Sequence, residues 1–278
     1  MVIEKIDINN SIKKEALRRG YSLRTIKSYQ DCAERFFKYC KKDVGKVSKV
    51  EVREYLDLLV SRGKSGNTIN VYLNALKFFF ENCLGKKMKI NIKYSKKPVK
   101  LPRVLSKEEL RKLFDAVDNS KHKLMLQLMY GAGLRVSELV NLKISDLKFD
   151  SGYGYVRQGK GKKDRMFIIP ESLKLELKKL IGSKKMNEFD YLFVSNRAEK
   201  YDIRSLQVLI KEACKKVGLN KEISCHTLRH SFATHLIEQG NSITDVQLLL
   251  GHNSPETTQI YLHTSLSRLN IKSPIDTL

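Results

Sequence analysis

The sequence predicts a mainly α-helical protein of two domains with one small β-sheet. Its 278 residues are enough for two hydrophobic cores. The first hundred residues show helical patterns only, whereas the remainder interrupts its helices with a single β-hairpin pattern. A basic stretch that contains proline lies between these two parts. We therefore expect a helical domain at 1–85, a basic linker at 86–104, a second domain at 105–265 and a C-terminal tail at 266–278.

Three helices are expected in the first hundred residues, beginning at Ser22, Ser48 and Ser65. The second opens with the capping box SKVE, in which a serine and a glutamate satisfy each other's backbone N–H groups. The first and third repeat each other at an offset of 43 residues, from RGYS to RGKS. The apolar residues that follow keep helical spacing in both copies, so we expect them to form the core.

The repeat also places a serine and a threonine at the start of each helix. Such residues are first of all N-caps. A helix N-terminus also suits phosphate oxygens, so paired docking of both helices on a DNA backbone stays open as a second role. The residues concerned are Ser22, Thr25, Ser65 and Thr68.

The linker combines many lysines with Pro98 and Pro102, which disfavour a helix and favour an extended segment. An extended basic segment can lie along a phosphate backbone, and Lys96 and Lys97 are its candidate contacts. The alternative is a solvated tether between the two domains.

The second domain opens with the capping box SKEE and continues into HKLMLQLMYGAG, which reads as a buried helix ended by glycine. Two short runs, Tyr153 to Arg157 and Arg165 to Ile169, flank a Gly-Lys-Gly-Lys-Lys tip and predict a β-hairpin. Four further helices are expected to open with RSLQV, CHTLR, SITDV and SPETT.

The charge balance is strongly basic, because 53 Lys and Arg against 30 Asp and Glu give a net charge of +23. An excess of this size favours a polyanionic partner, most often nucleic acid. Adaptation of a whole proteome toward lysine is the alternative, but it raises glutamate as well. No apolar run approaches the roughly 20 residues of a membrane span, and acidic residues stand where a signal peptide is apolar. We therefore expect an intracellular protein without a membrane segment.

The five cysteines are scattered and form no CxxC pair, which argues against a disulfide framework or a zinc ribbon. The segment CHTLRHSFATHL projects His226, Arg229 and His230 from one face of a helix. A zinc helix of the H-E-x-x-H type needs a carboxylate inside the pattern, and a guanidinium beside a dication is unfavourable, so no metal site is expected. A phosphate suits this face better, because Arg229 offers a planar fork of donors and His226 exchanges a proton near neutral pH.

Other segments offer groups of the same kind, each with an ordinary structural alternative. Arg135 follows a glycine-rich turn in GAGLRVSEL, and Glu138 either braces this arginine or caps the helix that begins there. Lys160 lies between two glycines at the hairpin tip, where most lysines are simply exposed. Taken alone, His252 would be a helix C-cap and Tyr261 a core tyrosine.

Five sequence boxes occur in one order: GAGLRVSEL, GKGKKDR, HTLRHSFATHL, LLGH and TTQIY. In this order they resemble the signature boxes of the tyrosine site-specific recombinases, most closely those of the Xer branch. The resemblance covers residues 100–265 and extends more loosely to the N-terminal helices, which are similar to the family's SAM-like core-binding domain. It implies that 105–265 is the catalytic domain and that the two domains form a C-shaped clamp.

The resemblance implies that Tyr261 attacks a DNA phosphodiester, forming a 3′-phosphotyrosyl bond and a free 5′-hydroxyl. A phenol with a pKa of about 10 needs a base and a stabilised transition state for this attack. Arg135 and Arg229 would hold the non-bridging oxygens. Lys160 would be the general acid, His226 the base, His252 a phosphate ligand and Glu138 the acidic neighbour of the first arginine. Because the covalent link conserves the bond energy, no metal, ATP or other cofactor is implied.

The resemblance also implies the partners. They are double-stranded DNA with an inverted-repeat core site, three further copies of the chain in a tetramer on two duplexes, and an accessory regulator, all within the nucleoid of the cytoplasm. The tail 266–278 would pack on a neighbouring subunit. We expect resolution of chromosome or plasmid dimers, with mobile-element integration as the alternative. A type IB topoisomerase and a DNA-binding protein without turnover are two further interpretations.

Overall fold

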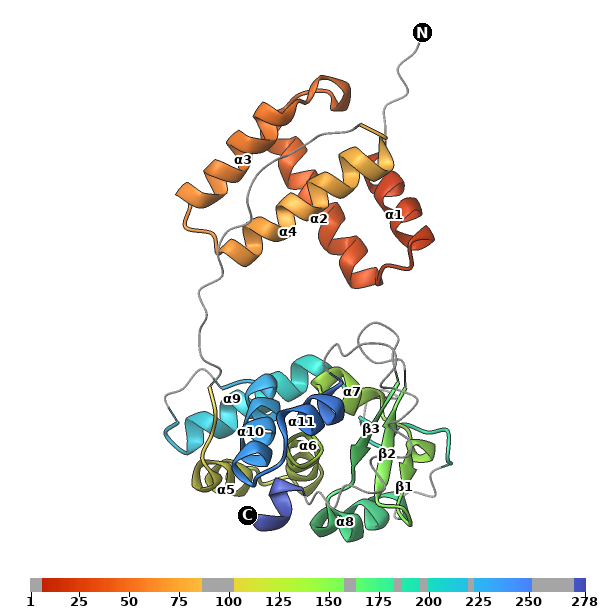
Figure 1. The fold of residues 1–278 in the computed structure, drawn as a ribbon, viewed down its shortest axis with the longest axis vertical. Helices are drawn as coiled ribbons and strands as arrows, with labels where there is room; N and C mark the ends of the chain where they lie inside the picture. The colour runs from red at the N-terminus through yellow and green to blue at the C-terminus, as the bar shows by residue number, and fades with distance from the viewer. Residues whose placement is uncertain are drawn as a thin grey trace. The chain divides into compact units, whose positions relative to one another are not determined.

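A computed structural model of the chain divides it into two units, Met1–Lys100 and Leu101–Leu278 (Figure 1). The predicted fold class is confirmed, since the described residues are mostly helical and their β-sheet is small and confined to the second unit. None of the helices in the described ranges has the length and apolarity to cross a membrane. The described residues are 7–86, 103–157, 164–182, 187–195, 200–219, 223–251 and 273–278.

The described part of the first unit is built mainly from α-helices. Three of them begin at the predicted caps, because the side chains of Ser22, Ser48 and Ser65 accept hydrogen bonds from first-turn N–H groups. The N-terminal helix, capped by Asp7, is an addition that the sequence pattern did not predict. The elements are α1 (Ile8–Arg18), α2 (Leu23–Cys40), the 3-10 turn η1 (Val44–Lys46), α3 (Lys49–Ser61), α4 (Gly66–Lys77) and the π-helical turn η2 (Phe78–Cys83).

The 43-residue repeat of the sequence is also a repeat of structure. In each copy an arginine, Arg19 or Arg62, is the C-cap of a helix, a glycine then turns the chain, and a serine caps the next helix. Gly20 has a φ of +70° and Gly63 a φ of +66°, in the left-handed region that suits glycine. The two copies are therefore helical hairpins, α1–α2 and α3–α4.

Aromatic side chains from both hairpins fill the core of the first unit. Phe36 of α2 packs edge-on against Tyr55 of α3 and Phe80 of η2, with ring centroids 5.4 Å and 6.4 Å apart. This packing uses the apolar stripe that the repeat predicts, so the helical spacing of the sequence and the core agree. The largest fully buried side chains of this unit are Phe36, Phe79, Phe80, Ile12, Leu73 and Leu76.

The second unit combines helices with a three-stranded antiparallel sheet of order β1-β2-β3. The predicted hairpin is present as β2 and β3, with Val156 opposite Arg165, while β1 and α8 were not predicted. Gly154 of β2 is covered by the ring of Phe167, to which a Cβ would approach within 2.2 Å. The elements are α5 (Lys107–Asp115), α6 (Ser120–Gly131), α7 (Val136–Asn141), η3 (Ile144–Asp146), β1 (Leu147–Lys148), β2 (Tyr153–Val156), β3 (Arg165–Ile168), α8 (Glu171–Gly182), α9 (Ile203–Lys216), α10 (Cys225–Glu238), α11 (Ile243–Leu250) and η4 (Pro274–Thr277).

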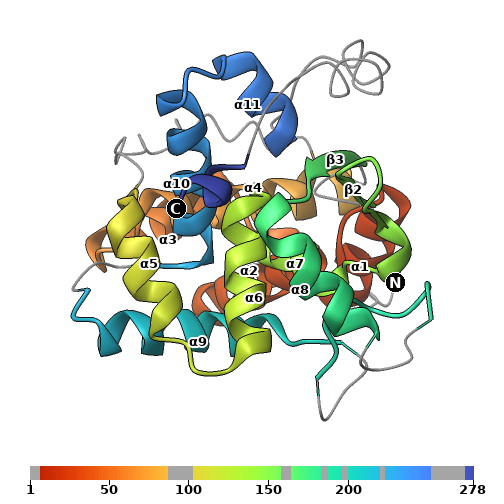
Figure 2. The same cartoon turned by 90° about the horizontal axis from the view of Figure 1, so that it is seen from below.

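Helix α6 runs through the middle of this unit, and α5, α8 and α10 pack against it (Figures 1 and 2). Its buried side chains include Leu124, Leu126 and Met129, which point in different directions around the helix axis. This burial confirms that HKLMLQLMYGAG is a buried helix. The helix ends directly before the turn that carries Arg135, so the best-packed element of the unit positions the candidate site.

The start of the second unit is anchored on α10. Leu105 is fully buried, and its N–H donates to Oγ of Ser231 at 2.9 Å. The Ser231 hydroxyl in turn donates to the carbonyl of Thr227 at 2.9 Å. The chain is therefore tied to the helix of His226 and Arg229 before the first helix of the unit begins.

The end of the chain packs on the same unit. Oγ of Ser273 donates to the carbonyl of Gly131, and Ile275 is buried where a Cβ on that glycine would approach within 2.7 Å. The Asp276 carboxylate accepts hydrogen bonds of 3.2 Å and 3.0 Å from the first N–H groups of α8. The described part of the tail thus lies on its own unit, and docking on a neighbouring subunit stays a prediction.

A buried histidine near the end of α10 makes the stability of the second unit depend on pH. His235 is 4% exposed, and its Nδ1 lies 2.9 Å from the Tyr130 hydroxyl. Burial lowers the pKa of His235; Glu238 opposes this shift and Lys107 reinforces it. An unfolded histidine has a pKa of about 6.5, so below that pH the unfolded state binds the proton first. We expect full stability above pH 6.5 and a loss of up to about 1.4 kcal/mol per pH unit as the pH falls.

Urea unfolding between pH 7.5 and 5.0 measures this loss. His235→Gln is the matched variant, because the amide can accept from Tyr130 but does not titrate. The variant should lose less stability on acidification than the wild type, with a remainder from His122 and His230, whose pKa values are also lowered. Identical pH dependence in both proteins would contradict the assignment to His235.

Candidate active site

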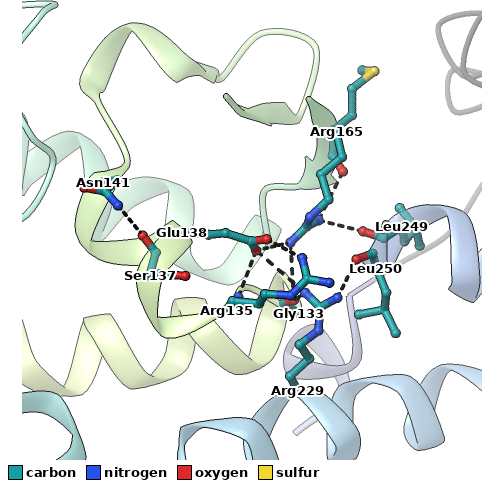
Figure 3. A network of polar contacts seen from close by, with 10 residues as sticks. Gly133, Arg135, Ser137, Glu138, Asn141, Arg165, Arg229, Leu249 and Leu250 are labelled. Carbon is teal, nitrogen blue, oxygen red and sulfur yellow. Dashed lines mark hydrogen bonds and ion pairs between the residues drawn. The ribbon is translucent and has the colours of Figure 1, made fainter. Parts of the chain in front are cut away.

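Glu138 lies in the first turn of α7 and connects the backbone of that helix to a catalytic candidate (Figure 3). Its Oε2 accepts from the backbone N–H of Arg135 at 2.9 Å, and its Oε1 lies 2.5 Å from Nη1 of the same arginine. The sequence left bracing and capping open, and Glu138 does both. The Arg135 side chain keeps 18% of its surface exposed, against 3% for Glu138, so the arginine is the member of the pair that a ligand can reach.

Arg229 approaches the same carboxylate from α10. Its Nη1 lies 3.7 Å from Oε2 of Glu138 and donates to the carbonyl of Gly133 at 2.6 Å, while Nη2 donates to the carbonyl of Leu250. Gly133 has a φ of +58°, and a Cβ there would lie 2.5 Å from the ring of Phe232, so this turn requires glycine. A guanidinium carries five N–H donors, and the two carbonyls leave further donors for a ligand.

A third arginine, Arg165, completes the cluster and is absent from the site residues that the sequence predicts. It is the first residue of β3, with Nη2 2.6 Å from Oε2 of Glu138 and Nη1 2.6 Å from the carbonyl oxygen of Leu249. Strand alternation gives only a weak signal for it, because Arg165 shares its face of β3 with the buried Phe167, but Met166 on the opposite face is buried as well.

Three guanidiniums therefore share one carboxylate, which gives these four described side chains a net charge of +2 in a mostly buried site. Burial opposes ionisation of Glu138, but the charge and hydrogen bond of Arg165 outweigh it, so the pKa of this carboxyl lies below its ordinary value. Burial, with the charges of Arg165 and Arg135, lowers the pKa of Arg229 to about 9, which still leaves it charged at neutral pH. Such a site favours an anion, and it favours most an anion whose negative charge grows during a reaction.

The remaining candidates are only partly located. His226 is exposed in the first turn of α10, one turn before Arg229. Within the described ranges, no group of three or more His, Cys, Asp or Glu residues is arranged to hold a metal ion. The predicted site residues that lie outside the described residues are Lys160, His252 and Tyr261, and with them the linker residues Lys96 and Lys97.

In the first unit, two of the four predicted DNA contacts, Ser22 and Ser65, are helix N-caps, and the other two, Thr25 and Thr68, are the residues whose N–H groups they cap. Oγ of Ser22 accepts from the N–H of Thr25 at 3.1 Å, and their hydroxyls lie 2.8 Å apart. Ser65 and Thr68 repeat this arrangement at 3.3 Å and 2.9 Å. The capping role is therefore confirmed in both hairpins. Both serines are exposed, so their contact with DNA stays a prediction.

Comparison with known protein families matches both units of the chain. Residues 9–90 match the N-terminal SAM-like domain of phage integrases, and residues 103–268 match the phage integrase family itself. The chain belongs to the phage integrase family. This recombinase is accordingly an enzyme that cleaves and rejoins DNA.

Similar proteins place the recombinase in the Xer branch. Tyrosine recombinase XerA of Pyrococcus horikoshii is 39% identical to it over 255 residues, which are 90% of this chain and 86% of the relative. The structure of the XerH recombinase bound to its difH substrate is 25% identical, covers 93% of this chain and 83% of its own, and has a TM-score of 0.67. A lambda integrase tetramer bound to a Holliday junction shares the fold, with a TM-score of 0.72 at 22% identity over 90% of this chain and 77% of its own.

Proposed function

We propose that this recombinase resolves chromosome or plasmid dimers by cutting and rejoining two copies of one DNA site. The observation that carries the proposal is the cluster of three arginines around Glu138, with two positive charges left for a DNA phosphate. A phosphodiester carries one negative charge, and the phosphorane-like transition state of its displacement carries more, so the cluster binds the transition state better than the ground state. The names of the relatives, XerA and XerH, support the biological role.

In the proposed reaction, Arg135 and Arg229 donate hydrogen bonds to the non-bridging oxygens of the scissile phosphate. Arg135 is the more exposed of the two, and its guanidinium is held by Glu138 at 2.5 Å. Arg229 is held by backbone carbonyls on two sides, which fixes its plane before DNA arrives. Donors that are oriented in advance stabilise developing charge without reorganising during the reaction.

The bond changes follow from the chemistry of the remaining candidates. The phenolic oxygen of Tyr261 forms a bond to phosphorus as the bond from phosphorus to the 5′-oxygen breaks, and His226 accepts the phenolic proton. Lys160 supplies a proton to the departing 5′-oxygen, and His252 donates a hydrogen bond to the phosphate. The exposed position of His226, one turn from Arg229, suits a proton acceptor at the edge of the site. Ligation reverses these steps, so the chemistry requires no cofactor.

The proposed substrate is double-stranded DNA with an inverted-repeat core site, bound by four copies of the recombinase on two duplexes in the nucleoid. The net charge of +23 supports a long contact with the phosphate backbone. In the first unit, the N-termini of α2 and α4 would each bind a phosphate of the DNA backbone. The lysines of the linker would extend this contact.

Covalent capture tests the proposal. The full chain is mixed with nicked fragments of its own genome in EDTA and quenched with denaturant, and the DNA that stays attached to protein is sequenced. We expect adducts at one locus near the replication terminus. Adducts at the edge of a mobile element would favour integration instead, and the absence of adducts, with DNA binding retained, would contradict the proposed recombination.

Lys160→Ala should slow cleavage by about 10²-fold or more, because the 5′-oxygen then leaves without a proton. A duplex with sulfur at the 5′-bridging position should restore the rate, since a thiolate leaves without protonation. Single-turnover adduct formation on the captured site measures both rates. Failure of the sulfur duplex to restore the rate would remove Lys160 from the role of acid.

A further inference from the structure

Arg165 connects three segments of the second unit that meet at the arginine cluster (Figure 3). From β3, its guanidinium reaches Glu138 of α7 at 2.6 Å and the carbonyl of Leu249 in α11 at 2.6 Å. A longer hydrogen bond of 3.4 Å reaches the carbonyl of Gly133 in the turn before α7. The Arg165 side chain is only 6% exposed, the same fraction as that of Arg229, and both of its Nη atoms are bonded to these partners.

The end of α11 is held by two arginines in succession. Arg165 binds the carbonyl of Leu249, and Arg229 binds the carbonyl of Leu250. The last carbonyls of a helix have no partner within the helix, and cations suit them. Gly251 then ends the helix with a φ of +58°, and a Cβ there would lie 2.7 Å from Cδ of Arg165. The backbone of Gly251 therefore packs directly against the Arg165 side chain.

Stability does not account for this arrangement. Burying the Arg165 guanidinium beside those of Arg135 and Arg229 costs free energy. Burial lowers the pKa of Arg165, although the charge of Glu138 opposes this shift. Among the described residues, Nε of Arg165 has no hydrogen-bond partner. Apolar side chains of similar volume often replace buried ion pairs without loss of stability. The buried charge of Arg165 lies against catalytic candidates, and such an arrangement indicates a role in the reaction rather than in stability.

We infer that Arg165 is a positioning residue of the recombination reaction. It holds the Glu138 carboxylate and the end of α11, and through them it sets the guanidinium planes of Arg135 and Arg229 before DNA binds. The inference rests on the proposed function, because it assigns these two arginines to the scissile phosphate. A displacement of about 1 Å in such a site costs about 10²-fold in rate.

Two variants separate position from charge. Arg165→Lys keeps the charge but loses the fork that reaches two partners at once, and Arg165→Met removes the charge at similar volume. Arg157→Met is the matched control, because Arg157 lies in the same hairpin and pairs with Asp146 at 2.9 Å, but is 64% exposed. All three variants are made in the full chain and measured on a duplex that contains the DNA site found by covalent capture. Single-turnover cleavage and DNA affinity are recorded separately.

We expect both Arg165 variants to lose about 10²-fold in cleavage rate with DNA affinity within about twofold of the wild type. The 5′-bridging sulfur duplex should not restore them, because the proton donor is not what they lack. Wild-type rates in Arg165→Lys would overturn the inference. Full restoration by sulfur would also overturn it, since Arg165 would then act by placing Lys160.

A second measurement does not need the DNA site. Sulfate binds arginine clusters as phosphate does, so at matched ionic strength it should raise the midpoint of thermal unfolding of the wild type and of Arg157→Met. Arg165→Lys should lose most of this rise, and an unchanged response would contradict the inference. If the wild type forms no adduct with any DNA, the proposed function fails, and the sulfate response still decides the role of Arg165.

Discussion

Tyr261→Phe abolishes the covalent adduct between the recombinase and DNA while leaving DNA affinity unchanged; this is the largest effect that we expect. The substitution removes one oxygen atom, and no other group in the proposed site can form the ester. Loss of a nucleophile lowers turnover by about 10⁴-fold or more. The measurement is adduct formation on the captured duplex, with affinity measured in parallel by gel shift.

The control for this substitution is another tyrosine of the second unit. Tyr201 donates to or accepts from His122, so its hydroxyl has a structural partner and no proposed part in catalysis. Tyr201→Phe should form the adduct at the wild-type rate. An adduct that persists in Tyr261→Phe would move the nucleophile to another residue, whereas loss of DNA binding in that variant would point to a structural defect.

Glu138→Ala should lower the free energy of unfolding of the second unit by about 3–5 kcal/mol, because it leaves buried guanidiniums without a counter-charge. Three arginines lie against this carboxylate, at 2.5 Å, 2.6 Å and 3.7 Å. Cleavage should fall with stability, since the arginines repel one another once the carboxylate is gone. Urea-dependent hydrogen exchange of peptides from α7 and α10 follows this unit separately from the first.

Glu171→Ala is the matched control for this loss. Glu171 also pairs with a cation three residues away, Lys174 at 2.6 Å, but 75% of its side chain is exposed. Exposed pairs of this kind contribute only about 0.2–1 kcal/mol. A loss of no more than about 1 kcal/mol in both Glu171→Ala and Glu138→Ala would mean that the arginine cluster does not depend on its carboxylate.

Sequence patterns were sufficient to predict features whose interacting residues are close together in the sequence. Helix caps depend on a few neighbouring residues, so Ser22, Ser48 and Ser65 were placed correctly. The pair of Arg135 and Glu138 is likewise a contact within one helical turn. Such features are encoded within a window of four residues.

Arg165 escaped prediction because its role depends on contacts that are distant in the sequence. It lies in a hairpin rich in basic residues, in a chain with 53 of them, so its charge carried no information by itself. Its partners Glu138 and Leu249 are 27 and 84 residues away. The helix α1 escaped for a different reason, since it buries only Ile12 and Ala16 completely and its apolar pattern is short.

The anchoring of Leu105 on Ser231 decides how the catalytic half can be produced as a separate fragment. A fragment that begins at Leu105 would turn its buried N–H into a charged ammonium beside Oγ of Ser231, which is expensive to bury. A fragment that ends at residue 265 would remove Ile275 from α6 and leave the first N–H groups of α8 without Asp276. A soluble catalytic half therefore has to begin several residues before Leu105 and retain the last six residues of the chain.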